Sequence, residues 1–250
     1  MVLLDRGDVL QLLSGPEEAH DLSGTQIAAS EPVATFVGVD CRFMPDDQPA
    51  CDHLEEMAFP LETWGPLVVV SAPEHPNGGI PLMARHRVMA RTGGTTVSFD
   101  PAVAPDATLG AGEWLEFDSD QDFVVQGSGP ISVASVMWGQ EATRATSGGD
   151  PALATGIPTS QWRREYDFLV PDTYTSNGLN VVREAEAEVR LDGVALDGFV
   201  AIGASGYERR RVSVSEGSHR IEGDGRFSIT AYGYAQYTSY WYPAGLDLLR

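Results

Sequence analysis

Short runs of β-branched and aromatic residues recur along the chain, and Gly, Pro, Asp or Ser bounds each run. This pattern is typical of β-strands, and its spacing predicts an all-β fold of sandwich or barrel type. Helical periodicity is weak, and the one window that we consider for a helix, residues 51–57, is too short to be stable without tertiary contacts. The predicted strands are residues 9–13, 33–37, 68–70, 87–90, 95–99, 114–117, 131–137, 189–191, 211–214 and 227–234.

Three segments share one pattern of apolar and polar positions. Residues 27–35, 125–133 and 221–229 align without a gap, and each is read as a strand, a tight polar turn and a second strand. The alignment places Ile131 and Phe227 at equivalent positions. Self-similarity of this kind indicates an internal repeat.

A second repeated segment supports the same division of the chain. A Pro followed four residues later by a Trp occurs at Trp64 and again at Trp162, and an apolar run follows each Trp. We therefore expect tandem antiparallel β-sandwich-like units with internal repeats: a truncated first unit with a disulfide loop over residues 1–56, a second over 57–150 and a third over 151–250.

The charge balance excludes two classes of partner. The 250 residues include 36 acidic and 16 basic residues, every basic one being Arg, and the formal net charge is −20. This charge opposes binding to nucleic acid and to anionic membrane surfaces. No stretch approaches the ~20 apolar residues of a membrane span. We expect no nucleic-acid partner and no membrane insertion, and the lysine-free, Ala- and Gly-rich composition suggests a bacterial source.

The two cysteines lie ten positions apart. Cys41 and Cys51 flank a segment with Pro45 and Pro49, whose turn chemistry allows the chain to double back within disulfide reach. A disulfide is typical of an oxidising compartment. The start of the chain nevertheless has no pattern of a signal peptide. We therefore expect a fragment of a larger protein that is extracellular or at the cell surface.

An acidic run with one histidine follows the second cysteine. Asp52, His53, Glu55 and Glu56 could bind a metal or form an acidic recognition loop. The favoured interpretation is that they tie the loop to neighbouring backbone, because no His-Glu-x-x-His spacing accompanies them. They remain candidate binding residues, and we expect neither a metal nor a cofactor.

A second acidic segment resembles the opening of a calcium loop. Asp118, Asp120 and Asp122 alternate as calcium ligands do, but Phe123 and Gly129 stand where the sharp-turn Gly and the bidentate Glu belong. A solvated turn is favoured over weak calcium binding. The chain also lacks a Gly-x-Ser-x-Gly elbow and a phosphate-binding glycine loop, so we name no catalytic residues.

The carboxy-terminal part is unusually aromatic. Tyr234, Tyr237, Tyr240 and Trp241 are candidate binding residues because Tyr and Trp supply large amphipathic contact areas. The alternative, which we favour, places these rings in the core. Alternating aromatic residues on a strand usually present one ring face to the core and the other to solvent.

A further set of residues, spread over nearly the whole chain, matches a family pattern. They are Pro32-Val33-Ala34, Gly38, Cys41, the run Cys51–Glu56, Pro60, Trp64-Gly65, Tyr232-Gly233-Tyr234, Tyr240, Tyr242-Pro243 and Gly245. Together they resemble the IgGFc-binding protein amino-terminal domain family. The resemblance implies a binding or adhesive module of large secreted or surface proteins. The Fc binding that names the family is not transferred by it.

The combined interpretation is a non-enzymatic, extracellular or cell-surface module for recognition and adhesion, with a protein or glycan ligand. Two alternatives stay open. One is a structural spacer whose repeats set distance in a large surface protein. The other is a fragment of a carbohydrate-active or metal-dependent enzyme, which would require convergent carboxylates in a concave site.

Overall fold

The computed structural model describes residues 2–15, 20–146 and 148–248. Antiparallel strands dominate it, which confirms the all-β prediction. No helix of these ranges is both long and apolar enough to cross a membrane. The elements are β1 (Phe36–Phe43), β2 (Cys51–Met57), η2 (Leu61–Thr63), β3 (Gly65–Val70), β4 (Ala84–Ala90), β5 (Thr95–Asp100), β6 (Ala107–Leu109), β7 (Trp114–Ser119), β8 (Phe123–Met137), α1 (Gln140–Thr143), β9 (Leu153–Thr155), η3 (Thr159–Gln161), β10 (Arg163–Val170), β11 (Ser176–Glu184), β12 (Val189–Leu191), β13 (Val194–Ala195), β14 (Val200–Ala201), β15 (Tyr207–Ser213), β16 (Gly217–Ala235) and β17 (Thr238–Pro243).

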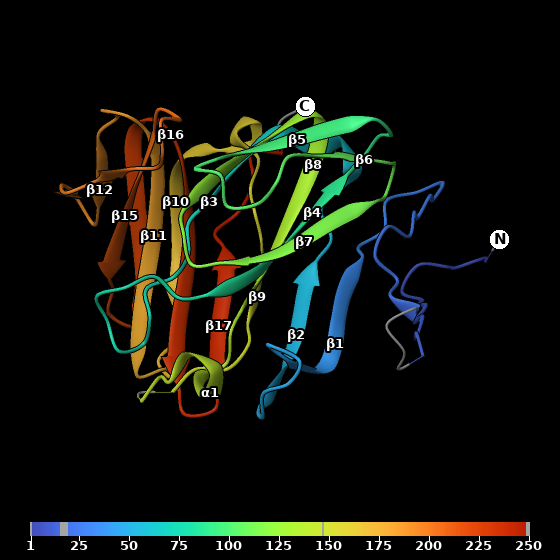
Figure 1. Cartoon of the computed structure of the whole chain (residues 1–250), viewed down its shortest axis with the longest axis horizontal. Helices are drawn as coiled ribbons and strands as arrows, with labels where there is room; N and C mark the ends of the chain where they lie inside the picture. Colours follow the sequence, from blue (N-terminus) through green and yellow to red (C-terminus); the bar gives the residue numbers. More distant parts are fainter. Residues whose placement is uncertain (1, 16–19, 147, 249–250) are drawn as a thin grey trace.

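Each of the two large sheets is organised around one long strand, β8 or β16 (Figure 1). Strands β3 and β5 flank the first half of β8, and β4 and β9 flank its second half. Strands β10 and β12 flank the first half of β16 in the same way, and β11 and β17 flank its second half. The two sheets therefore share one pairing scheme.

A register shift lies between the two halves of each long strand. Gly65 pairs with Ile131, whereas Leu67, two residues later, pairs with Gln126. The corresponding shift in the other sheet lies between the pairs Arg163–Phe227 and Glu165–Glu222. Because such irregularities bend a strand, each long strand contributes to both layers of a sandwich. The prediction of a polar turn within each of the segments 125–133 and 221–229 is therefore wrong, because both segments are continuous strand.

Three further predictions near the start of the chain are corrected. Residues 9–13 form no strand and are exposed, because no described segment pairs with them. The strand expected at 33–37 begins only at Phe36. Residues 51–57, the one window considered for a helix, form strand β2, in which Leu54 is buried and its neighbours are more exposed. The other predicted strands lie within observed ones, except that β15 ends before Val214.

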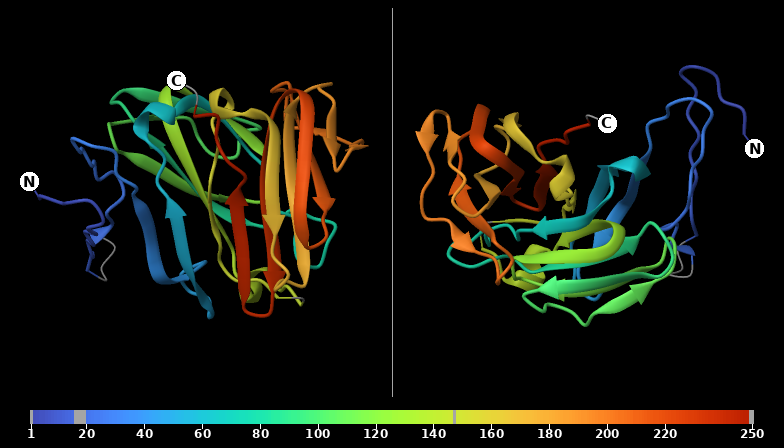
Figure 2. Two further views of the ribbon diagram at one scale, coloured as in Figure 1. Left: turned by 180° about the vertical axis from the view of Figure 1, so that it is seen from behind. Right: turned by 90° about the horizontal axis from the view of Figure 1, so that it is seen from above.

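Each sandwich has its own apolar core, and further apolar clusters join the two. Val68, Val88 and Ile131 belong to the core around β8, and Tyr166 and Phe227 to the core around β16. The shared clusters are Leu82, Ala84, Met137, Ala152, Ala154, Tyr232, Tyr234 and Trp241, and Val69, Val124, Ile157, Trp162, Val182 and Ile202. Seen from above, the two sandwiches lie side by side (Figure 2, right).

The exact division into units stays a prediction. Strand β9 pairs with β8, although the division proposed from the sequence assigns residues 153–155 to the third unit. Strands β1 and β2 form a separate two-stranded sheet.

Candidate functional site

The disulfide predicted between Cys41 and Cys51 is present. It closes the loop that connects β1 to β2, here called the disulfide loop (residues 41–51). Within this loop Met44 is buried, and its carbonyl oxygen accepts a hydrogen bond of 2.8 Å from the N–H of Gly139. The disulfide loop is therefore packed against the residues that follow β8.

The segment after β8 also forms hydrogen bonds with residues of β16 and β17. The N–H of Gln140 donates to the carbonyl of Gly149 at 2.9 Å, and the N–H of Gly149 donates to the carbonyl of Ala235 at 3.0 Å. The N–H of Asp150 donates to the hydroxyl of Ser239 at 2.9 Å. Ala235 and Ser239 flank the turn between β16 and β17.

Three segments that are distant in the sequence therefore meet at one end of the molecule. This end, here called the loop end, comprises the disulfide loop, the described residues of 139–150 and the turn at 235–239. In Figure 1 all three lie at the bottom of the view, around α1. The sequence indicated the first and the third of these segments separately, but no local signal indicated that they meet.

Carboxylates accumulate in the loop end and beside it. Asp150 is buried, and its Oδ1 atom has no hydrogen-bond partner among the described residues. Burial raises the pKa of Asp150 to about 6, and the charges of Asp52 and Glu141 add to this effect. Asp52, which belongs to the acidic run after Cys51, therefore lies close enough to the segment after β8 to raise the pKa of Asp150.

The rest of that acidic run makes mostly local contacts. Oδ1 of Asp52 accepts a hydrogen bond from the N–H of His53 at 2.8 Å. The exposed side chains of His53 and Glu55 approach each other to 3.4 Å. Burial raises the pKa of Glu56, although its carboxylate accepts hydrogen bonds from the N–H groups of Met57 and Thr155.

These contacts agree with the interpretation that the run ties β2 to neighbouring backbone. Its role in binding stays a prediction. No group of three or more His, Cys, Asp or Glu side chains within the described residues is placed to hold a metal ion.

The structure separates the four aromatic candidates. Tyr234 and Trp241 are buried between the sandwiches, and the hydroxyl of Tyr234 donates to the carbonyl of Glu74 at 2.7 Å. Tyr240 is half-buried and donates to the side chain of Asn177 at 2.9 Å. Tyr237 alone of the four is largely exposed, at 60 %, in the turn of the loop end. The first two rings are therefore core residues and are not accessible to a ligand.

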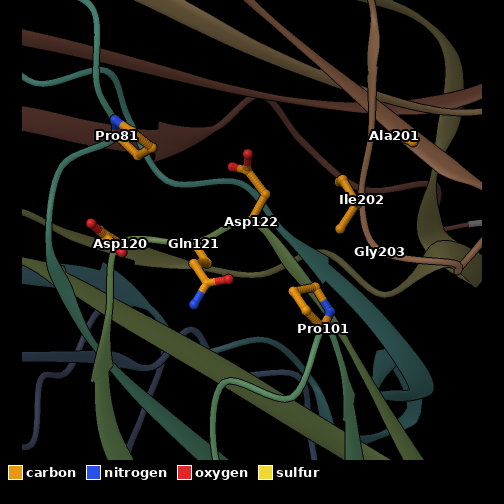
Figure 3. Close-up of a pocket in the computed structure, with 8 residues that line it drawn as sticks. All are labelled: Pro81, Pro101, Asp120, Gln121, Asp122, Ala201, Ile202 and Gly203. Carbon is orange, nitrogen blue, oxygen red and sulfur yellow. The ribbon is translucent and has the colours of Figure 1, made fainter.

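A cleft of about 400 Å³ lies between the two sandwiches (Figure 3). Its lining residues are Pro81, Pro101, Asp120, Gln121, Asp122, Ala201, Ile202 and Gly203. Beside it, the carboxylate of Asp100 accepts the N–H of Ala204 at 2.9 Å, which links the two sandwiches.

The carboxylate of Asp122 at this cleft is fully engaged. It forms ion pairs with Arg209 and Arg211 and accepts hydrogen bonds from Ser71 and the N–H of Ala72. The sequence did not indicate that the carboxylate paired with these arginines belongs to the other sandwich. The ion pairs of Asp122 with Arg209 and Arg211 therefore connect the two sandwiches across their interface.

The three carboxylates of the calcium-like segment do not converge. Asp118 forms an ion pair with Arg85, at 2.9 Å between Nε and Oδ1, whereas Asp122 is directed to the arginines of β15. Asp120 faces the cleft and forms no ion pair with Arg85 or with the arginines of β15. This arrangement agrees with the favoured reading of a turn rather than a calcium loop.

Comparison with known proteins identifies the family. No curated protein sequence matches the chain. A solved structure described as an anti-sigma factor domain-containing protein is similar, with 8 % identity and a TM-score of 0.22 over 71 % of this chain and 81 % of the other. A TM-score this low carries no argument. The family model described as IgGFc binding protein matches residues 1–233. The chain therefore belongs to the IgGFc binding protein family, a family of binding domains.

Proposed function

We propose that this chain is a non-enzymatic recognition module of a secreted or cell-surface protein, and that its loop end binds a protein ligand. The supporting observation is the hydrogen-bonded assembly of three distant segments at one end of two packed sandwiches. Loops that a rigid β-scaffold holds at one end are a common location of binding sites.

The chemistry of the loop end favours a protein ligand. The exposed ring of Tyr237 offers a rigid, amphipathic contact, which is the type of side chain that often dominates protein interfaces. The nearby carboxylates of Asp52 and Glu141 add negative charge, which attracts a partner with a basic patch and increases its rate of association. The disulfide supports a location outside the reducing cytosol.

The test is a binding measurement with purified protein. The Fc fragment of immunoglobulin G is the first probe because the family description names it, and a panel of extracellular proteins and a glycan array follow. We expect binding to a protein probe that weakens about tenfold or more in the double variant Asp52→Asn, Tyr237→Ser. Val194→Ser is the control, because Val194 is similarly exposed on β13. Strand β13 pairs with β12, which lies far from the loop end in Figure 1.

Each other outcome has a defined meaning. Equal binding by the double variant and the control would place the site away from the loop end. Binding to glycans alone would change the ligand class. Absence of binding to every probe would favour the spacer, for which the packed apolar clusters between the sandwiches would supply rigidity.

A further inference from the structure

A small cavity lies where the two sandwiches pack on each other. It has a volume of about 30 Å³, and residues in or next to β3, β8, β9, β11, β16 and β17 line it. Both apolar clusters that join the sandwiches contribute to the lining, one through Trp241 and the other through Val182. Strand β9, which pairs with β8, and strand β17, which pairs with β16, lie side by side (Figure 1). The cavity therefore lies within the joint between the sandwiches.

Two buried polar atoms at this cavity have no hydrogen-bond partner among the described residues. They are Oδ1 of Asn180, a residue that is 1 % exposed, and the indole Nε1 of Trp241, which is 5 % exposed. Both residues line the cavity. An unpaired polar group inside a protein costs free energy, so such groups normally bind a protein atom or an ordered water.

The orientation of the Asn180 amide follows from its other contacts. Its Nδ2 donates to the carbonyl of Ser71 at 2.9 Å and lies 3.4 Å from the hydroxyl oxygen of Thr230. A flipped amide would place its oxygen against the carbonyl oxygen of Ser71, and two acceptors form no hydrogen bond. Oδ1 of Asn180 is therefore the unpaired atom, and it requires a donor.

Ser135, another lining residue, adds an acceptor to the same cavity. Nε2 of His86 lies 3.3 Å from the carbonyl oxygen of Ser119, so this nitrogen carries the proton of the ring. Burial lowers the pKa of His86 to about 4, so the ring is neutral at pH 7 and its Nδ1 accepts a hydrogen bond from the Ser135 hydroxyl at 2.8 Å. The hydroxyl proton of Ser135 is thus used, and its oxygen can still accept a hydrogen bond.

These groups select one kind of ligand. The indole N–H of Trp241 requires an acceptor, whereas Oδ1 of Asn180 requires a donor. A metal cation cannot accept a hydrogen bond and a halide cannot donate one, but a water molecule does both. A cavity needs about 10 to 15 Å³ for each water, so a volume of about 30 Å³ has room for one or two waters and excludes larger molecules.

From this geometry we infer that the cavity binds one or two ordered waters, which accept the indole N–H of Trp241 and donate to Oδ1 of Asn180. A buried water typically forms about three hydrogen bonds, and the oxygen of Ser135 supplies a further acceptor. Asn180 and Trp241 belong to the sandwich around β16, and Ser135 belongs to β8. The bound water thus connects the two sandwiches, independently of the loop end and its proposed ligand.

The first test is the contact of the indole protons with water. Nuclear Overhauser effects between water and the Nε1 proton of each tryptophan are measured by NMR on the wild-type protein. Trp162 is the matched control, because it is also buried, at 1 % exposed, but its indole N–H donates to the carbonyl of Ile157. We expect an effect at Trp241 with the sign of a long-lived bound water, and a severalfold weaker effect at Trp162.

A variant that fills the cavity gives the second test. Ser228 lines the cavity and is 8 % exposed, and Ser228→Val adds apolar volume there. Filling a dry cavity stabilises a protein, whereas displacing a bound water leaves Asn180 and Trp241 unpaired and destabilises it. We expect the melting temperature to fall by about 2 to 4 °C. Relaxation dispersion of ¹⁷O, which counts long-lived waters without a contribution from hydroxyl protons, should show one or two fewer waters.

The control for this variant is Ser98→Val. Ser98 is exposed on β5 and does not line the cavity, so this substitution should change neither the water count nor the effect at Trp241. Equal water effects at Trp241 and Trp162 overturn the inference. A Ser228→Val variant whose melting temperature rises overturns it too, and so does one that keeps the water effect at Trp241, because that water lies outside the cavity. If Ser228→Val does not fold, the comparison of Trp241 with Trp162 in the wild type decides.

Discussion

Trp64 and Trp162 occupy equivalent places in the two sandwiches. Each follows a single 3₁₀ turn, η2 or η3, that begins after a proline. The indole N–H of Trp64 donates to the carbonyl of Phe59 at 3.4 Å, and that of Trp162 donates to the carbonyl of Ile157 at 3.1 Å. The strand after each Trp then pairs with the first half of a long strand. The two positions that the sequence alignment pairs thus share these local contacts.

The two tryptophans differ in burial, so replacing each by Ala should lower the free energy of unfolding by different amounts. Trp162 is 1 % exposed, whereas Trp64 is only half-buried. We expect Trp162→Ala to lower the free energy of unfolding by about 3 to 5 kcal/mol, as for other buried aromatic residues. Trp64→Ala should cost clearly less. Urea denaturation measures both values, and equal losses would show that burial does not set the difference.

The disulfide should contribute to stability without deciding the fold. For a loop of about ten residues, the chain-entropy estimate for Cys41→Ser is a loss of roughly 2 to 3 kcal/mol. The double variant Cys41→Ser, Cys51→Ser should lose a similar amount, because both variants lack the same bond. Thermal denaturation compares them with wild type. Two free thiols detected in the oxidised wild-type protein by mass spectrometry would contradict the prediction.

The carboxylate of Asp122 should be important for stability. Asp122→Asn leaves Arg209 and Arg211 with no full negative charge in a largely buried interface, and we expect a loss of about 3 to 5 kcal/mol. Asp120→Asn is the control, since Asp120 is exposed at the same cleft, and it should change stability by less than about 0.5 kcal/mol. Similar losses in the two variants would argue against the buried ion pairs as the cause.

Asp150 should make stability depend on pH in an unusual direction. Burial, with Asp52 and Glu141, raises its folded-state pKa from 3.8 to about 6, so the folded protein binds the proton more tightly than the unfolded chain does. Its ionisation therefore destabilises the fold as the pH rises through about 6. Between pH 7 and pH 5, wild type should gain about 1 kcal/mol relative to Asp150→Asn. Chemical denaturation at both pH values measures this difference, and a constant difference would exclude the effect.

Substitution of Tyr237 and of Tyr240 should distinguish an exposed ring from one that packs in the fold. Tyr237→Ser should leave the melting temperature nearly unchanged, because the ring is exposed in a turn. Tyr240→Ser should lower it, since the half-buried ring contacts Tyr174 and its hydroxyl binds Asn177. We expect a loss of about 1 to 3 kcal/mol for Tyr240→Ser. A large loss for Tyr237→Ser would instead assign that ring to the core.

The sequence by itself determined the features that depend on local pattern. Alternating β-branched and aromatic residues marked most strands, because a strand places successive side chains on opposite faces. The spacing of Cys41 and Cys51 and the turn residues between them were enough to predict the disulfide. The gap-free alignment of the three repeated segments also identified Ile131 and Phe227, which both lie at the register shift of a long strand.

The tertiary structure decided the features that need a distant partner. Residues 9–13 have the composition of a strand but form none, because a strand requires a neighbour to bind its backbone groups. Tyr234 and Tyr237 are both tyrosines of one aromatic run, and only the packing of one sandwich on the other buries the first and leaves the second exposed. The loop end arises in the same way, since it depends on contacts between distant segments that local sequence does not encode.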